Sequence, residues 1–298
     1  MKWINFGWGS SFSDVFSKND NFNVSFKNSV KSNTPPIEVA TRAISDIAKT
    51  YPPPYTLMVS GGVDSQTMLW LWLQSKVPFT AVSVKYVSPD RTSWFNEHDL
   101  YELKLFSEKH NIPIEYKEID IIDFFETRLI DYATQYQCNS PQICTHMAMT
   151  ELIPTGTVIF SGNFVSHVHY TYTIWGLKRY ADKVNRPVIP YFLLHDAELT
   201  RLTDNLETIS PRYRITTLDS YLNKIKSLEK IGIPVIPQPT KQTGFEKIKE
   251  YYDQFTERVT VQDRIKYNRM PSKRVFDILF RYRIGDKIPY QDKVIYHV

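Results

Sequence analysis

Residues 56–69 read TLMVSGGVDSQTML, an apolar run followed directly by Ser60, Gly61 and Gly62 and then by a second apolar stretch. Two adjacent glycines weaken both a strand and a helix, so they indicate that something approaches the backbone closely here. The pattern predicts a buried strand, a tight turn and a helix that begins near Asp64. The first amide groups of such a helix lack internal acceptors and lie at its positive end, so they favour a bound phosphate.

The polar side chains of this turn refine that prediction. Ser60 and Ser65 supply hydroxyl donors, whereas Asp64 on its own would repel a phosphate. A carboxylate is expected there if Mg²⁺ lies between it and the phosphate oxygens, which is a common arrangement for this ion. The spacing differs from both GxxxxGKS and GxGxxG. A glycine-rich turn with a capping serine is the alternative interpretation, but it does not account for the whole SGGVDS hexamer.

The flanking sequence alternates between strand and helix patterns. Apolar residues recur at helical spacing from Ile37 to Ile47, and Asn96 or Asp99 is expected to cap a later helix. Strands are predicted over residues 56–60, 79–87, 112–116 and 157–160. This alternation predicts an α/β fold, a doubly wound parallel sheet with flanking helices, whose ligands bind beyond the carboxyl ends of the strands. A second glycine turn, Ser161-Gly162, falls at such an end.

Three regions of the chain differ in character. Residues 1–35 are polar and are expected to form an N-terminal extension that docks on the main body. Residues 36–195 hold the alternating α/β pattern. Residues 196–298 carry apolar stripes at helical spacing, the first over residues 199–209 and the last over residues 275–282, and predict a mainly helical C-terminal substrate or lid region.

Charge and cysteine content limit the classes of function. The net charge of +4 suits an anionic small molecule and permits nucleic acid without requiring it. Two cysteines, Cys138 and Cys144, are too few for a sulfur-liganded zinc site or a disulfide framework. The N-terminus is too polar for a signal peptide, and the sequence has no apolar run of membrane-spanning length. We therefore expect a cytoplasmic protein with no membrane partner.

The hexamer SGGVDS resembles the signature of the N-type ATP pyrophosphatases, also called the PP-loop superfamily, whose members cleave ATP between the α and β phosphates. The stretch from FTAVSVKYVSPD to NEHDLYELKLFSEKHNIPIEYKEIDI, together with VIFSGN, is similar to the synthetase domain of asparagine synthetases and β-lactam synthetases. The resemblance covers residues 37–165. It implies the adenine nucleotide alpha hydrolase-like version of the α/β fold, with ATP and Mg²⁺ as cofactors.

The resemblance also implies roles for individual residues. Ser60, Gly61, Gly62, Asp64 and Ser65 are expected to hold the pyrophosphate. Asp64 is the metal ligand, and Asp64 and Ser65 take part in catalysis. The expected nucleotide site is completed by Val59, Val63, Val84, Ser161 and Gly162.

Two departures from the asparagine synthetase pattern and one further similarity to it bear on function. The acidic pair that follows the second glycine motif in that family is replaced by Ser166-His167. Lys2 follows Met1, where a glutaminase domain has an exposed cysteine, so ammonia is expected from solution, from a separate donor or from the substrate. Lys273 is the candidate cation for the adenylate or pyrophosphate, because the segment around it is similar to a late element of the family.

The leading prediction is an AMP-forming ligase that adenylates a small-molecule carboxylate or amide and transfers an amine or ammonia to it. A tRNA- or nucleobase-modifying enzyme on the same fold is the second interpretation, although the charge does not favour nucleic acid. A non-catalytic nucleotide-binding protein is the third, because Ser166-His167 replaces the acidic pair.

Other chemistry-bearing residues have ordinary explanations as well. His146, His167 and His169 are candidate metal ligands or proton relays, but they are equally typical of packing at the edge of a site. Cys138 and Cys144 lack the CxxC spacing of a sulfur-transfer pair. The basic segment 272–287 is a candidate RNA surface, and its spacing also fits the solvated side of an amphipathic helix.

Overall fold

The structure is a computed structural model of the 298-residue chain. It describes residues 4–8, 22–26, 34–138, 140–161, 171–194, 218–237, 244–270, 272–287 and 294–297. The predicted helical stripe over residues 199–209 lies outside the described residues, as do Gly162, Ser166, His167 and His169.

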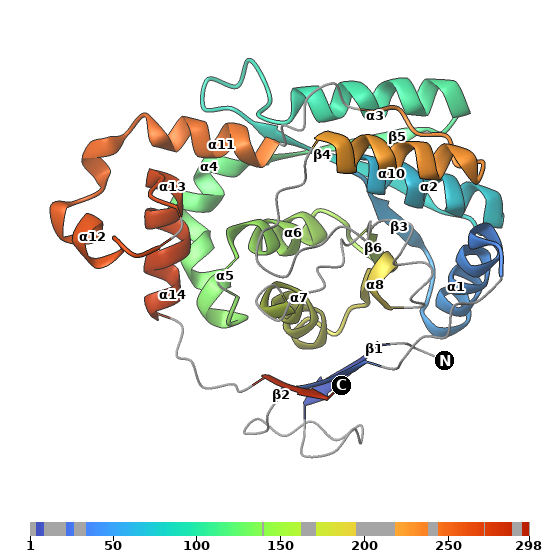
Figure 1. The fold of residues 1–298 in the computed structure, drawn as a ribbon, viewed down its shortest axis with the longest axis horizontal. Helices are drawn as coiled ribbons and strands as arrows, with labels where there is room; N and C mark the ends of the chain where they lie inside the picture. Colours follow the sequence, from blue (N-terminus) through green and yellow to red (C-terminus); the bar gives the residue numbers. More distant parts are fainter. Residues whose placement is uncertain are drawn as a thin grey trace.

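A five-stranded parallel sheet forms the centre of the molecule, in the order β5-β4-β3-β6-β7 (Figure 1). Its strands are β3 (Tyr55–Met58), β4 (Thr80–Val87), β5 (Ile114–Asp120), β6 (Thr157–Phe160) and β7 (Val188–Pro190). All residues of β3 and β6 are buried, as expected for central strands that are covered on both faces. The predicted α/β fold, a doubly wound parallel sheet with flanking helices, is confirmed.

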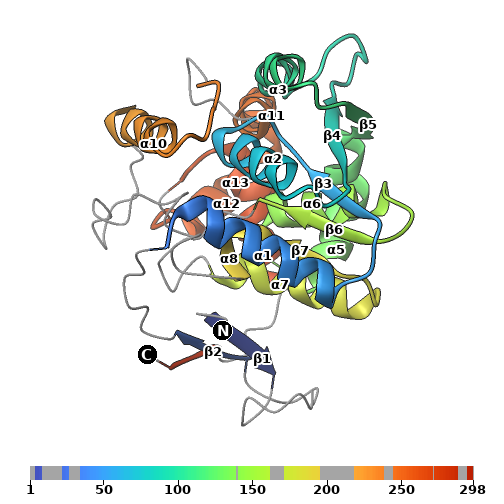
Figure 2. The same ribbon diagram turned by 90° about the vertical axis from the view of Figure 1, so that its right-hand side faces the viewer.

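Helices cover both faces of this sheet (Figure 2). One face, with Leu57 and Ile159, packs against α1 (Pro36–Thr50), α2 (Val63–Ser75) and α3 (Glu97–His110). The other face, with Met58 and Phe160, packs against a second group of helices. That group comprises α4 (Ile121–Asp123), η1 (Phe124–Arg128), α5 (Leu129–Gln135), α6 (Pro141–Glu151) and α7 (Thr171–Lys183).

The sequence explains the boundaries of α1 and the burial of α2. A proline at the first position of α1 suits a helix start, and the prolines at 52–54 follow its end. Apolar residues surround α2 on nearly all sides, which predicts a helix without a solvent face. Most of α2 is indeed buried, because α10 (Leu218–Lys230) returns from the second half of the chain and adds Ile225 and Leu228 to the same core.

The C-terminal part is mainly helical and packs on the second face of the sheet. It contains α11 (Gly244–Asp253), η2 (Thr256–Arg258), α12 (Val261–Lys266), α13 (Val275–Asp277), η3 (Ile278–Tyr282) and α14 (Arg283–Lys287). Its rings surround Phe125 of η1, with Phe245, Phe276 and Phe280 at centroid distances of 5.5–6.0 Å. Such ring contacts add stability beyond the burial of their area. In Figure 1 this part lies at the opposite end of the molecule from α1 and α2.

A separate three-stranded sheet joins the two ends of the chain. β1 (Ile4–Trp8) pairs antiparallel with β2 (Phe22–Phe26), and β2 pairs parallel with β8 (Val294–His297). The expected N-terminal extension thus contributes two strands, and the last strand of the sheet comes from the far end of the sequence. Within the described residues, no helix combines the length and apolarity needed to cross a membrane.

Candidate functional site

The turn between β3 and α2 leaves backbone amide groups available for a ligand. β3 ends at Met58 and α2 begins at Val63, with Gly62 as its N-cap and no side chain capping the helix. The first intrahelical bond that returns to the turn is donated by the amide of Gln66 to the carbonyl of Gly62, at 3.0 Å. The amides of Val63, Asp64 and Ser65 precede it and have no intrahelical acceptor. They therefore form an uncapped positive end at the carboxyl edge of the sheet.

Two serine hydroxyls hold this turn in shape. The Oγ atoms of Ser60 and Ser65 lie 3.0 Å apart, and the backbone N–H of Ser60 donates to Oγ of Ser65 at 3.1 Å. A hydroxyl that accepts one such bond still has a proton to donate. Because one of the two hydroxyls donates its proton to the other, one hydroxyl proton of the pair remains for a ligand beside the amides of the first turn of α2.

Gly61 explains why the sequence needs a glycine pair here. Its φ is +89°, a left-handed conformation that side chains disfavour. A Cβ on Gly61 would also lie only 2.0 Å from the backbone oxygen of Asp99 in α3. Gly62 has an ordinary φ of −63°, and a Cβ there would meet Oγ of Ser60 at 3.6 Å. The close approach inferred from the sequence is therefore, at Gly61, an approach of the turn to α3.

Asp64 is paired with a lysine from the second half of the chain. Its carboxylate forms an ion pair with the ammonium of Lys224, which lies on α10. The two side chains are only 20% and 15% exposed, respectively. Because burial disfavours an unpaired charge, each group is held in place by the other. α10 thereby delivers a cation to the first turn of α2, 160 residues away along the chain.

Gln66 fastens the segment that follows α10 to the same turn. Its side-chain amide is fully buried and pairs with both backbone groups of Ile236, accepting from N at 2.6 Å and donating to O at 3.0 Å. The same Nε2 also donates to the carbonyl of Gly61 at 2.7 Å. One side chain thus links the glycine turn, α2 and residues 231–237. Buried polar groups that are fully paired in this way restrict the backbone to one arrangement.

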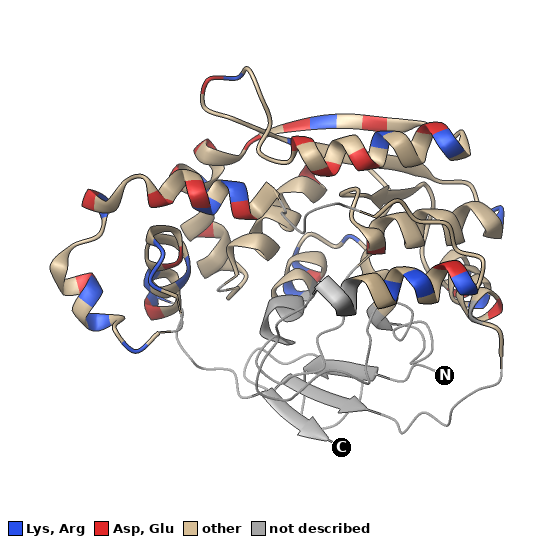
Figure 3. Cartoon of the chain, turned by 45° about the horizontal axis from the view of Figure 1, so that its top comes forward, with Lys and Arg blue, Asp and Glu red and all other residues tan. Residues whose placement is uncertain are grey.

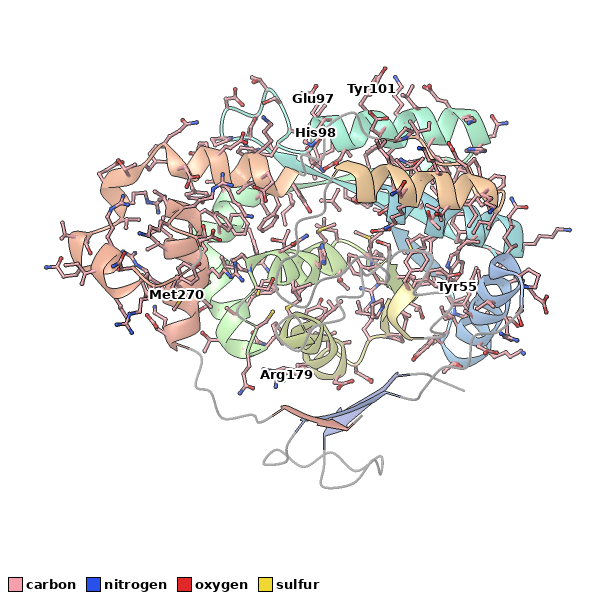
Figure 4. All side chains as sticks on the ribbon, in the orientation of Figure 1. Tyr55, Glu97, His98, Tyr101, Arg179 and Met270 are labelled. Carbon is pink, nitrogen blue, oxygen red and sulfur yellow. The ribbon has the colours of Figure 1, made fainter. Side chains whose placement is uncertain are left out.

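The start of α3 forms the other wall of the turn. Asn96 is the N-cap residue of α3, as predicted, but its side chain does not cap the helix, because it accepts from the N–H of Tyr86 and donates to the carbonyl of Val84 in β4. Asp99 instead receives the N–H of Gly244 at the start of α11, at 3.0 Å. Glu102 lies one turn further along α3, and burial together with the charge of Asp99 raises the pKa of Glu102. Glu97 and His98 mark this end of α3 in Figure 4.

The other predicted nucleotide residues that the structure describes lie directly after β3 and β6, at the start of α2 and in β4. Val59, Val63 and Val84 are buried, and the N–H of Val59 donates to the carbonyl of Val82 at 2.9 Å. Ser161 follows β6, and its carbonyl accepts from the N–H of Phe192 at 3.0 Å. With these valine side chains in the core, any contact they make with an adenosine would come from the backbone.

Lys273 is not brought to this turn. It is exposed, and its ammonium donates to Oδ1 of Asn268 at 3.1 Å. It immediately precedes Arg274 and α13, which Figure 1 places far from α2. Lys224 is the cation that the structure positions there instead. No sequence signal distinguishes Lys224 from the other lysines of its amphipathic helix, because its role depends on how α10 packs.

His146 lies near the second glycine turn but has no partner metal ligands among the described residues. Its ring stacks on Phe160 at a centroid distance of 5.0 Å. Burial lowers the pKa of His146 to about 4, so the imidazole is neutral at pH 7. No group of three or more His, Cys, Asp or Glu side chains that could hold a metal occurs in the described part of the chain.

The two cysteines are buried neighbours rather than an exposed sulfur-transfer pair. Sγ of Cys144 lies 3.6 Å from the carbonyl oxygen of Cys138, and both side chains are almost fully inaccessible. Their mutual hydrogen bond lowers the pKa of Cys138 and, together with burial, raises that of Cys144. Gly176 of α7 lies directly against Cys138, where a Cβ would come within 2.5 Å. This packing is typical of structural thiols.

No known family profile matches the sequence, and no curated protein matches it. Among solved structures, the chain is similar to a predicted tRNA methyltransferase subunit from Methanocaldococcus jannaschii, at 12% identity and a TM-score of 0.33 over 63% of this chain and 94% of that one. It is also similar to the U34-tRNA thiolase NcsA from Methanococcus maripaludis, at 14% identity and a TM-score of 0.34, over 86% and 80% of the two chains.

A third similar structure is the NH₃-dependent NAD synthetase from Campylobacter jejuni, at 16% identity and a TM-score of 0.36 over 68% of this chain and 86% of that one. All three TM-scores are below 0.5. The function of the turn after β3 must therefore be inferred from the contacts of this chain.

Proposed function

We propose that the turn between β3 and α2 binds the β and γ phosphates of ATP, and that the protein is an ATP-dependent, AMP-forming enzyme. The observation that carries this proposal is the set of free amides at Val63, Asp64 and Ser65, flanked by the hydroxyls of Ser60 and Ser65. Donors that point at one position on a helix N-terminus are suited to an anion, and they require no rearrangement to receive it.

Lys224 extends this phosphate site with a positive charge. In the absence of an anion, its partner is the carboxylate of Asp64. A phosphate at the start of α2 competes for the same ammonium, which then neutralises the leaving pyrophosphate. The Gln66–Ile236 pairing supports this role, because it ties the segment after α10 to the turn.

A magnesium ion fits this donor set. The ion is commonly held by one or two carboxylates together with phosphate oxygens, and Asp64 is a carboxylate at the edge of the phosphate position. When bound, Mg²⁺ supplies charge neutralisation between the phosphate groups. Asp64 would hold it, and the shift of Lys224 from Asp64 towards the phosphates would free the carboxylate.

The reaction class follows from which phosphate is left open. With the β and γ phosphates on the turn, the α phosphorus faces the carboxyl edge of the sheet. An oxygen of a carboxylate or amide acceptor attacks that phosphorus, and the bond to the pyrophosphate breaks. An amine or ammonia then attacks the activated carbon, loses a proton and displaces AMP. The chain contributes positioning and charge stabilisation to both steps.

The products of ATP cleavage and the affinity for ATP test this proposal. The protein is incubated with Mg²⁺, α-labelled ATP and pools of carboxylates with ammonia, and AMP plus pyrophosphate is the expected outcome rather than ADP. Binding of a non-hydrolysable ATP analogue is measured by calorimetry in parallel. Turnover to ADP, or failure to bind the analogue, contradicts the proposal. Binding without any turnover selects the non-catalytic nucleotide-binding alternative.

Two substitutions locate the chemistry at the turn. Asp64→Asn is expected to abolish pyrophosphate release and leave the fold intact, because the amide cannot serve the metal as a carboxylate does. Lys224→Ala is expected to lower the rate of pyrophosphate release by about 100-fold or more, the size of effect seen when one charge-stabilising donor is removed. Lys226→Ala is the matched control, because Lys226 is an exposed lysine of the same helix.

A further inference from the structure

Positive charge is concentrated in one short part of the C-terminal region. Residues 256–287, here called the distal tip, contain nine lysines and arginines against four aspartates and glutamates. Their net charge of +5 exceeds the +4 of the whole chain, so the remaining residues together carry −1. The mildly basic character of the protein is therefore a property of the distal tip alone.

Four of the nine cations are used within the fold. Arg258 pairs with Glu126 on η1, and Arg274 pairs with Asp253 and Glu246 on α11. Arg283 pairs with Asp263, and Lys266 pairs with Asp286. These ion pairs and the aromatic cluster around Phe125 hold the distal tip against the body of the protein.

The other five cations have no carboxylate partner among the described residues. They are Arg264, Arg269, Lys273, Arg281 and Lys287, and all five are exposed. Figure 3 shows Lys and Arg positions along α12 and the turn that follows it, and Figure 4 places Met270 in the same area. Five exposed cations without carboxylate partners, all within residues 264–287, are suited to contact with a polyanion.

The exposed apolar and aromatic side chains of the distal tip indicate which kind of polyanion this surface suits. Val261 and Ile265 are 69% and 70% exposed, and Met270 is 42% exposed. Three single side chains, two of them on a six-residue helix, are too few for the apolar centre of a protein interface of ordinary size. In the described residues of the distal tip no aromatic ring is exposed, since Tyr267 is buried and Tyr282 packs against it. The composition therefore favours contacts with phosphates over stacking on bases.

We propose that the distal tip binds the phosphate backbone of a nucleic acid, through Arg264, Arg269, Lys273, Arg281 and Lys287. This inference does not depend on the ATP chemistry proposed above. The two regions are joined through α11, because its first residue, Gly244, donates to the side chain of Asp99, whose backbone oxygen lies against Gly61. From there α11 leads towards the distal tip over ten residues, about 15 Å.

Fluorescence anisotropy with labelled, unfractionated tRNA tests this surface, and a duplex DNA of similar length forms a second arm. We expect wild-type protein to bind at least one of the two, with an affinity that falls steeply as salt rises. The triple variant Arg264→Glu, Arg269→Glu, Lys273→Glu should lose at least tenfold in affinity. Its salt dependence should be shallower by a slope of about 2–3, because three phosphate contacts are lost.

A charge-matched variant separates a local surface from net charge. Lys109→Glu, Lys226→Glu and Lys230→Glu replace three exposed lysines on α3 and α10 with the same total change in charge. This control is expected to bind within about twofold of wild type. Equal losses in both triple variants would overturn the proposal, as would wild-type protein that binds neither nucleic acid at 100 mM salt, which would leave an acidic protein as the partner. A glutamine version of the first triple variant, with an unchanged melting temperature, excludes misfolding as the cause.

Discussion

The turn after β3 and the distal tip both favour anions, but they are built in opposite ways. At the turn the donors are backbone amides, the neighbouring groups are buried, and the only described cation, Lys224, is already paired with Asp64. At the distal tip the donors are exposed side chains on short helices and on the segment between α12 and α13. An anion site made of backbone amides depends on the exact backbone conformation, so we expect it to tolerate few substitutions. A site made of side chains tolerates substitutions that change shape, and its affinity depends mainly on its charge.

The largest difference is expected between two adjacent glycines of the turn. Gly61→Ala places a Cβ 2.0 Å from the oxygen of Asp99 at a positive φ, so it should lower the free energy of unfolding by about 4 kcal/mol and abolish ATP binding. Gly62→Ala meets neither obstacle and should cost about 1 kcal/mol or less. Urea unfolding of both variants measures the contrast, and equal costs would mean that Gly61 does not touch α3.

A smaller effect is expected where the turn is tied to the second half of the chain. Gln66→Ala leaves the backbone N–H and C=O of Ile236 without their buried partner and creates a cavity. The free energy of unfolding should fall by about 3 kcal/mol. Gln74→Ala, at an exposed position of the same helix, should change it by no more than about 0.5 kcal/mol. Similar melting temperatures for the two variants would contradict a stabilising role of the Gln66–Ile236 pairing.

The smallest effect is expected within the distal tip, and it depends on pH. Hydrogen bonds from Lys266 and from Tyr267 lower the pKa of Asp286. A carboxyl whose pKa is lowered by folding contributes stability above its unfolded value, near 4, and loses that contribution as pH falls through the folded value. Asp286→Asn should therefore cost about 1 kcal/mol or less at pH 7. The difference between the unfolding curves of wild type and variant should shrink as pH falls below that unfolded value. A cost that does not shrink in acid would show that the variant loses packing and not charge.

The core of the fold could be predicted from the sequence. The apolar run before Ser60, the all-round apolar helix after it and the strand at 157–160 each follow from local periodicity, and each is found where expected. The three-residue β7 was not predicted, because so short a strand has no period. The strands at the chain ends were missed as well, since pairing between residues so far apart leaves no local pattern.

In the candidate site, too, the features set by local sequence were predictable and the contacts between distant residues were not. The backbone turn was predictable, because a glycine at positive φ next to a helix start leaves a mark in the sequence itself. Lys224, the Gln66–Ile236 pairing and the contact of Asp99 with Gly244 were not, because each joins residues more than 140 positions apart. Asn96 illustrates the limit: its type and position suit a helix cap, yet the nearby β4 backbone takes its hydrogen bonds.

The small sheet at the chain ends has a consequence for biosynthesis. β2 begins at Phe22, and its parallel partner β8 begins at Val294, so β2 is synthesised long before the strand with which it pairs. Domains otherwise fold in the order in which they leave the ribosome. The α/β core can therefore assemble before this sheet is complete, because β8 follows every strand of the core in the sequence. A chain that terminates before residue 294 would emerge with β2 unpaired along one side, an open strand edge available to other nascent chains.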